Sequence, residues 1–150
     1  KGALKRFIES EAWEKTKSGK VVSLSWPSGM AATAVDVLCL DRGADHVETR
    51  KAGAALAKSR GSSALLVLGA QVRRAAELAQ GLALRSYSFT ERKSEPGKDP
   101  DDVTLMVNKP EEVRDAAAPL MDVVSGVHMT RDLVAEPANH LPTMRLKNRA

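Results

Sequence analysis

Aromatic residues and cysteine are scarce in this chain of 150 residues. Aromatic side chains make up 3% of the sequence, so the stacking surfaces that bind bases or sugars are few. A single cysteine, Cys39, excludes an internal disulfide bond and any zinc site built from cysteines. Because Cys39 lies in an apolar run, a buried structural thiol is favoured over a nucleophile. The core must therefore be built from Val, Leu and Ala.

Long apolar runs and dense charge of one sign are also missing. No stretch approaches the roughly 20 apolar residues that span a bilayer, and no signal peptide is visible. We therefore expect a cytoplasmic protein with no membrane partner. The net charge is +4, but positive and negative residues are interleaved. This pattern favours a solvated surface, with a nucleic-acid face as the alternative.

The motifs of common catalytic sites do not occur. His46, His128 and His140 are far apart, and none belongs to a His-Glu-x-x-His helix that would place two metal ligands on one face. His128 is expected on a helix surface or at an interface. There is no Gly-x-Ser-x-Gly elbow, so Ser28-Gly29 is interpreted as a turn.

Two other polar positions carry weak signals. Gly69-Ala70 lies where a strand meets a helix, the place where α/β folds bind ligands, but a lone glycine does not define a phosphate loop. Asp101-Asp102 falls at the end of a charged loop, Arg92 to Asp102, and is expected to face solvent. We assign no catalytic, cofactor-binding or metal-binding residue.

Apolar patterns predict strands that alternate with helices. The predicted strands are Val21 to Trp26, Ala34 to Leu40, Ala64 to Leu68 and Val103 to Val107. The predicted helices are Gly2 to Lys15, His46 to Arg60 and Gln71 to Leu84. Asp45 and Glu48 are placed to form a capping box for the second helix. The alternation predicts an α/β fold with a largely parallel sheet flanked by helices.

The two later helices differ in character. Small residues such as Ala52 and Gly53 fill the helix at 46–60, which favours close approach to a sheet. The helix at 71–84 has one apolar face, and an opposite polar face is expected to carry four residues: Arg73, Arg74, Glu77 and Gln80.

A longer helical pattern dominates the C-terminal part, from Glu111 to Leu141, with Pro137 expected to end the helix. Its apolar stripe contains Val113, Ala116, Ala117, Leu120, Val123, Val124, Val127 and Val134. Such a stripe exceeds what a small domain needs, so we interpret the helix as a connector that packs on two bodies. Val123, Val127 and Val134 should therefore be partly exposed. For Arg131, Asp132 and Glu136, a solvated face is favoured over pairing across an interface.

Two segments carry a family resemblance. GLALRSYSFTERKS, residues 81–94, resembles the signature G-x-x-L-x-x-Y-x-F-x-x-Y-K of the leucyl aminopeptidase (cytosol aminopeptidase, PepA-type) family. TRDLVAEPANHLPT, residues 130–143, resembles A-R-D-L-V-N-E-P-A-N-x-L-T-P, the segment that joins the two domains in that family. Ala135 departs from the common Asn, and Pro142-Thr143 reverses the common Thr-Pro.

The resemblance implies a macro-domain-like N-terminal domain at 1–108, a linker helix at 109–136 and the beginning of a catalytic domain at 137–150. It implies a parent hydrolase that removes N-terminal residues from peptides, uses two divalent metal ions (Mn or Zn) and forms a homohexamer. The family motifs K-G-x-T-F-D-S-G-G and N-T-D-A-E-G-R-L do not occur in these 150 residues, so no catalytic residue is carried over. We expect an inactive fragment, with a truncated start, that serves in assembly and access. The alternatives are a macro-like module that binds a nucleotide or ADP-ribose, and a DNA-binding accessory domain.

Overall fold

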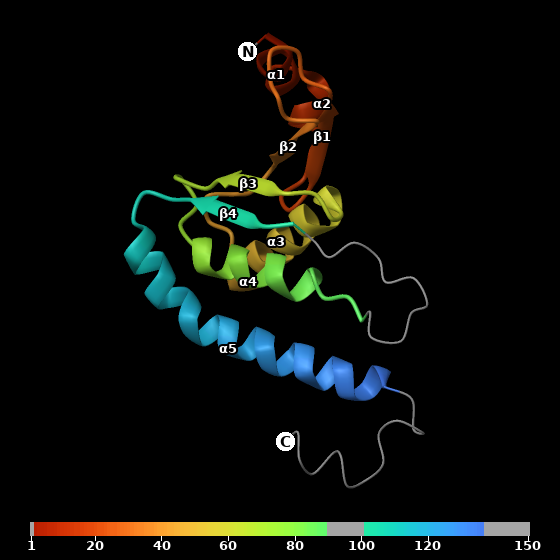
Figure 1. Ribbon diagram of the computed structural model, residues 1–150. Helices are drawn as coiled ribbons and strands as arrows, with labels where there is room; N and C mark the ends of the chain where they lie inside the picture. Colours follow the sequence, from red (N-terminus) through yellow and green to blue (C-terminus); the bar gives the residue numbers. More distant parts are fainter. Residues whose placement is uncertain (1, 90–100, 137–150) are drawn as a thin grey trace, which may run out of the picture.

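The computed structural model describes residues 2–89 and 101–136, and its layers follow one another in Figure 1: the β3–β4 sheet, the pair α3 and α4, and the long helix α5. In chain order the elements are α1 (Gly2–Ile8), α2 (Glu11–Glu14), β1 (Val21–Ser25), β2 (Ala34–Leu38), α3 (His46–Arg60), β3 (Leu65–Leu68), α4 (Ala75–Arg85), β4 (Val103–Met106) and α5 (Pro110–Ala135). The predicted α/β class and long C-terminal helix are confirmed.

The N-terminal segment forms two short helices, so the prediction of one helix over Gly2 to Lys15 is wrong. Ser10 separates them because its backbone is extended, with φ −88° and ψ 151°. Its Oγ accepts a hydrogen bond from the Trp13 backbone N–H at 3.4 Å and caps α2. The Phe7 and Trp13 rings then meet edge to face, with centroids 5.5 Å apart. A local capping residue therefore overrides the helical periodicity.

The strands pair in two ways. The predicted parallel pairing holds for β3 and β4, where Leu65 lies opposite Val103. Strands β1 and β2 are instead antiparallel, with Val21 opposite Leu38. The physical reason is the short connection between them, because a parallel crossover needs a dozen or more residues. In Figure 1 this antiparallel pair rises away from the body and carries α1 and α2 at its end.

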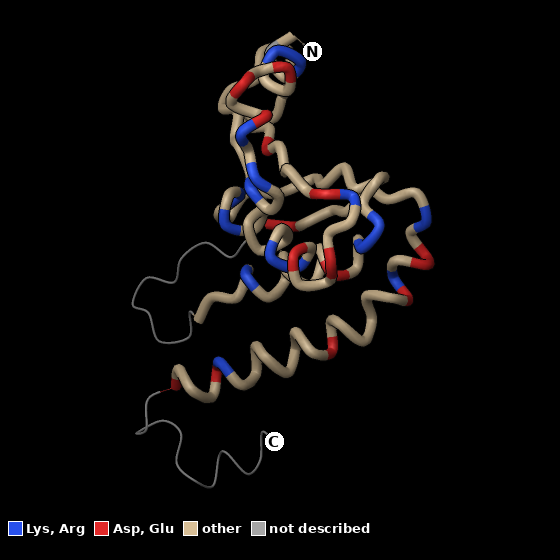
Figure 2. Tube along the Cα trace, turned by 180° about the vertical axis from the view of Figure 1, so that it is seen from behind, with Lys and Arg blue, Asp and Glu red and all other residues tan. Residues whose placement is uncertain are grey.

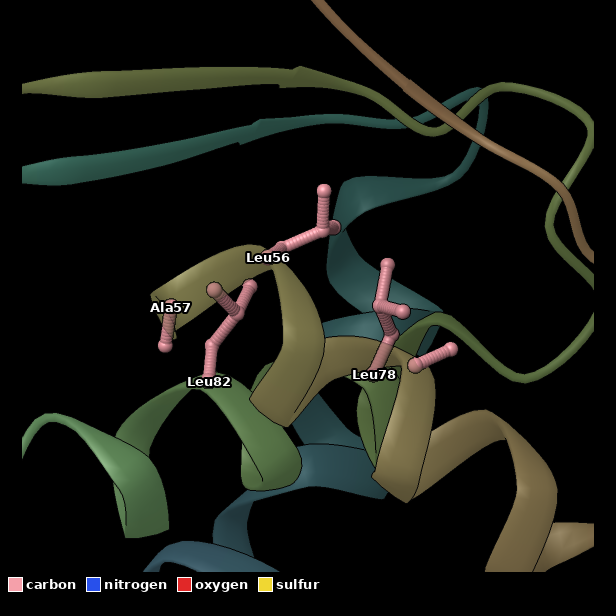
Figure 3. Close-up of a cluster of buried hydrophobic side chains, with 5 residues drawn as sticks. Leu56, Ala57, Leu78 and Leu82 are labelled. Carbon is pink, nitrogen blue, oxygen red and sulfur yellow. The ribbon is translucent and has the colours of Figure 1, made fainter. Parts of the chain in front are cut away.

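The hydrophobic core lies between the α3–α4 pair and the β3–β4 sheet. Its buried cluster consists of Ala52, Leu56, Ala57, Leu78 and Leu82. Figure 3 shows Leu56 from α3 and Leu78 and Leu82 from α4 directed toward the strands. The inner side chains of the sheet, Leu65, Val67, Val103 and Leu105, pack against this cluster. The core is thus built from small aliphatic side chains.

Helices α3 and α4 approach closely at two glycines. A Cβ atom on Gly53 would overlap the Leu78 carbonyl oxygen, and one on Gly81 would overlap the Arg50 carbonyl oxygen. Gly53 of α3 therefore serves contact with a helix, whereas Ala52 and Ala57 belong to the cluster that packs against the sheet, as we had expected. Gln80, which we had expected on the polar face of α4, is 4% exposed and belongs to the interior.

Candidate functional site

Helix α5 is too long for the helix on which it packs. It has 26 residues and so extends about 39 Å, whereas the 11 residues of α4 extend about 16 Å. Pro110 occupies its first turn, where a missing N–H costs little. Figure 2 shows few charged residues along the middle of α5, where Asp122 is the only one between Asp115 and Arg131. The helix thus has an apolar middle and charged ends.

One face of α5 packs against α4. Its half-buried residues follow helical spacing: Val113, Ala117, Leu120 and His128. Val124 lies at the centre of this face and is 5% exposed. It is the one buried residue of α5. Because an isolated helix gains most of its stability from such a face, this contact holds α5 against the domain.

The neighbouring flank of α5 remains exposed, as the connector interpretation predicts. Val123 is 54% exposed, Val127 38% and Val134 82%. Val123 and Val124 differ by about 100° around the helix, so one partner covers only part of the apolar stripe. The predicted partial exposure is confirmed. We call Val123, Val127 and Val134 the open flank of α5.

The C-terminal part of α5 is anchored by Tyr87, which follows α4. The Tyr87 hydroxyl donates a hydrogen bond to Asp132 Oδ1 at 2.8 Å, and Arg131 Cζ lies 4.0 Å from the Tyr87 ring centroid. The His128 ring packs against the same tyrosine, with centroids 5.2 Å apart. Asp132 is therefore paired and half-buried, contrary to the solvated face we had favoured.

The two segments that resemble the aminopeptidase family meet at this anchor. Tyr87 comes from the segment 81–94, and Arg131 and Asp132 come from the segment 130–143. His128 lies at an interface, as expected, and its Nε2 is buried without a hydrogen-bond partner among the described residues. Tyr87, the only tyrosine of the chain, is the Y of the quoted signature, but the sequence did not predict its contact with α5.

A polar cluster ties the N-terminal ends of α3 and α4 together. His46 Nδ1 lies 2.6 Å from Glu77 Oε1, and Arg74 Nη1 lies 2.9 Å from His46 Nε2. Arg74 also donates through Nε to the Ala44 carbonyl at 3.3 Å. Since these residues satisfy one another and the adjacent helix end, the cluster has a structural role.

The predicted capping box of α3 is confirmed. The Asp45 carboxylate accepts a hydrogen bond from the Glu48 backbone N–H at 2.8 Å, and the Glu48 carboxylate accepts one from the Asp45 N–H at 3.1 Å. The hydrogen bond from the Glu48 backbone is the largest cause of a lowered Asp45 pKa, and the nearby His46 and Arg74 contribute less. The charged form of Asp45 thus stabilises this helix end.

The weaker candidates take part in turns and packing. Asn108 Nδ2 donates to the Ala70 carbonyl at 3.0 Å and fixes the turn after β3. The Cys39 thiol is half-buried and lies 3.5 Å from the Thr16 carbonyl. Gly29 takes the left-handed conformation that a turn needs, with φ +77°.

The remaining candidates do not form a site either. The Asp101 carbonyl accepts a hydrogen bond from Arg60 Nη1 at 2.8 Å, and the side chains of Asp101 and Asp102 are exposed. His140 lies outside the described residues. Across residues 2–89 and 101–136, His, Cys, Asp and Glu form no group of three that could hold a metal ion. None of the helices in these ranges is long and apolar enough to cross a membrane.

These features define an α/β domain extended by a long helix, and comparison with known proteins finds that the chain is similar to probable cytosol aminopeptidases. The chain is 46% identical over 143 residues to a probable cytosol aminopeptidase of Cereibacter sphaeroides, covering 95% of this chain and 29% of that protein. It is 45% identical over 149 residues to a probable cytosol aminopeptidase of Dinoroseobacter shibae, covering 99% and 30%. The predicted resemblance to the cytosol aminopeptidase family is confirmed.

The chain spans about 30% of the length of these curated relatives. Among solved structures, the bottromycin maturation enzyme BotP shares the fold, with a TM-score of 0.70 over 99% of this chain and 33% of BotP. The sequence identity to BotP is 23%, so this likeness concerns the fold alone. No family model matches the chain.

Proposed function

We propose that this chain is the non-catalytic N-terminal domain and connector helix of a leucyl aminopeptidase-type enzyme that removes N-terminal residues from peptides. The observation that carries the proposal is the open flank of α5, an apolar surface on a helix much longer than its partner α4. It is supported by the aminopeptidase relatives, which are about three times as long as the chain.

The proposed role of α5 is to join this domain to the catalytic domain and to hold their relative orientation. Val124 and the Tyr87–Asp132 hydrogen bond fix α5 on the domain side, while Val123 and Val127 are free to pack against a second body. Burying such aliphatic side chains contributes roughly 1.5–3 kcal/mol each. A rigid connector would position the catalytic domains in an oligomer and restrict access of large substrates.

The two divalent metal ions of such an enzyme find no fitting site in this part of the chain. Because the described residues bring no three metal-binding side chains together, we assign no step of peptide hydrolysis to them. We propose that the ions bind in the catalytic domain. The peptide substrate, by the same argument, is expected to react there.

The experiment compares the 150-residue chain with the full-length protein. With added Mn²⁺ or Zn²⁺, the full-length protein should release p-nitroaniline from leucine p-nitroanilide, whereas the chain alone should not. Robust turnover by the chain would contradict the proposal.

The role of the open flank is tested in the full-length protein by Val123→Lys, with Ser125→Lys as the matched control. Both residues are exposed in this structure and lie on opposite sides of α5. Val123→Lys should impair assembly, measured by light scattering, and reduce peptidase activity, because it places a charge in the proposed contact. Ser125→Lys should preserve both. Equal behaviour of the two variants would refute the connector role.

A further inference from the structure

Residues 21–35 carry no charged side chain, although 28% of the residues of the chain are charged. They form the longest uncharged stretch of the sequence. The stretch covers β1, the start of β2 and the loop 26–33 between them. Exposed edge strands usually carry charged side chains, whereas the centres of protein interfaces are depleted of them. The composition of this segment is therefore typical of a contact surface.

The loop 26–33 lies at the end of the β1–β2 pair that is remote from the core. At the near end, Val21 lies opposite Leu38, and both pack against the core cluster. At the far end, Ser25 lies opposite Ala34. Figure 1 shows that the pair rises away from the body, so the loop belongs to a projecting arm. We call residues 26–33 the arm tip.

Two large apolar side chains are exposed at the arm tip. Trp26 is 79% exposed and Met30 58%. Trp and Met are enriched in protein interfaces, and Trp is among the residues that contribute most to binding energy. Ile8 of α1 is 45% exposed and lines the same groove as Met30, so it extends this apolar surface.

The arm tip is an ordered loop with a strained residue. The Trp26 N–H donates to the Thr33 carbonyl at 2.8 Å, and the Met30 N–H donates to the Pro27 carbonyl at 3.3 Å. Trp26 has a φ of 51°, and no other residue except glycine has a positive φ in the described part of the chain. This conformation costs free energy for a bulky residue, and strained residues cluster at functional sites. The loop thus holds an exposed tryptophan in place at a cost in stability.

The position of the arm indicates what covers its tip. In both Figure 1 and Figure 2, the arm and α5 lie at opposite ends of the body. The proposed catalytic domain follows α5, so it is attached at the end away from the arm. A covered tryptophan buries about 150–250 Å², whereas a stable interface buries about 800 Å² on each partner. The arm tip therefore suits an anchor within the larger contact that two subunits of one assembly make.

We propose that the arm tip anchors this polypeptide to a second copy of itself, with Trp26 and Met30 buried between the two subunits. The proposal rests on the proposed function, because it takes the catalytic domain to follow α5. It assigns the arm a direct contact between subunits. Helix α5, in contrast, acts within one subunit by orienting its two domains.

Oxidative footprinting of the full-length protein tests this contact residue by residue. Hydroxyl radicals oxidise exposed Trp and Met side chains, and mass spectrometry of the peptides measures the rate at Trp26 and Met30. Both should be oxidised about tenfold more slowly in the assembled protein than in subunits separated by dilution, because the centre of an interface excludes solvent. Light scattering identifies the two states.

Two outcomes would overturn the proposal. Fast oxidation in both states would show that the arm tip stays exposed in the assembly. Slow oxidation in both states would show that the same polypeptide covers the tip. A full-length protein that stays monomeric at every concentration would also refute the contact.

Trp26→Gly separates association from folding. Glycine takes a positive φ without strain, so this variant should raise the unfolding temperature of the 150-residue chain by about 2–4 °C. In the full-length protein it should weaken self-association by about tenfold or more, since the anchor is gone. Ser28→Ala is the control, because it changes an exposed residue of the same loop and should leave association unchanged.

The outcomes of Trp26→Gly also distinguish a contact from a structural role. If the variant lowers the unfolding temperature together with association, Trp26 stabilises the fold and the anchor is refuted. Unchanged association would refute it as well. Only a variant that folds at least as stably as the wild type and associates more weakly supports the proposal.

These readouts do not depend on peptidase activity. An active full-length enzyme whose Trp26 is oxidised at the same rate in both states would refute the anchor and leave the proposed function intact. An inactive full-length protein with Trp26 protected only in the assembly would refute the proposed enzyme function and support the anchor.

Discussion

Helices α3 and α4 meet backbone to backbone, whereas α4 and α5 meet through side chains. In the first contact, Gly53 and Gly81 each lie against a carbonyl group of the other helix. In the second, Val124 is the one buried residue that α5 contributes. The α3–α4 contact has no space for a side chain at Gly53 or Gly81, whereas the contact with α4 leaves much of α5 exposed. We infer that the first contact builds the domain and the second attaches a connector to it.

The largest expected effect on stability comes from adding one methyl group to Gly53 or to Gly81. Gly53→Ala and Gly81→Ala should destabilise the chain by about 1–3 kcal/mol or more, because backbone atoms must move apart to admit the Cβ. Gly126→Ala in α5 is the matched control, since no atom lies within 4 Å of its added Cβ. This substitution should stabilise by about 0.5–1 kcal/mol.

Urea unfolding followed by circular dichroism measures these differences. If Gly53→Ala and Gly126→Ala shift the midpoint alike, the close contact between α3 and α4 does not determine stability. If Gly81→Ala alone leaves the unfolding midpoint unchanged, α3 and α4 are in tight contact only at Gly53.

The second test compares neighbouring valines of α5. Val124→Ala should cost about 1–3 kcal/mol, since it removes buried methyl groups and leaves a cavity. Val123→Ala should change the free energy of unfolding of the 150-residue chain by less than about 0.5 kcal/mol, because Val123 is 54% exposed. Thermal unfolding of both variants checks this. Similar losses would mean that the open flank is covered in solution.

Much of this architecture could be predicted from local patterns. The capping box of Asp45 and Glu48 marks the start of α3. It could be predicted because its two hydrogen bonds join residues only three positions apart. The strand and helix pattern likewise gave the α/β class. The exposed valines of α5 followed from a stripe too wide for one partner.

The features that could not be predicted from the sequence are contacts between distant parts of the chain. Nothing near Gly53 in the sequence indicates that its partner is the backbone of Leu78. Tyr87 and Asp132 are 45 residues apart, so their hydrogen bond depends on how α4 and α5 pack. The antiparallel pairing of β1 and β2 could have been predicted from the sequence, because the short connection between them already excludes a crossover helix.

The smallest expected effect concerns the N-terminal end of α3. This end has a side-chain cap, whereas the N-terminal end of α5 has none. Lys109, at the start of α5, makes no side-chain cap, whereas Asp45 caps α3 as a carboxylate of lowered pKa. A carboxyl group whose folded-state pKa is lowered stabilises the fold above its ordinary pKa, here 3.8. This stabilisation is lost as the pH falls through the lower folded-state value.

Asp45→Asn keeps an acceptor for the Glu48 N–H but cannot titrate, so it separates the cap from its charge. Its free energy of unfolding should stay near that of the wild type at neutral pH and should decline less below pH 3.8. Asp45→Ala should be less stable at every pH, because the acceptor itself is gone. Urea titrations across the acid range measure all three proteins. If the Asn variant declines as steeply as the wild type, the charge of Asp45 does not stabilise α3, and the capped and uncapped helices differ only in hydrogen bonding.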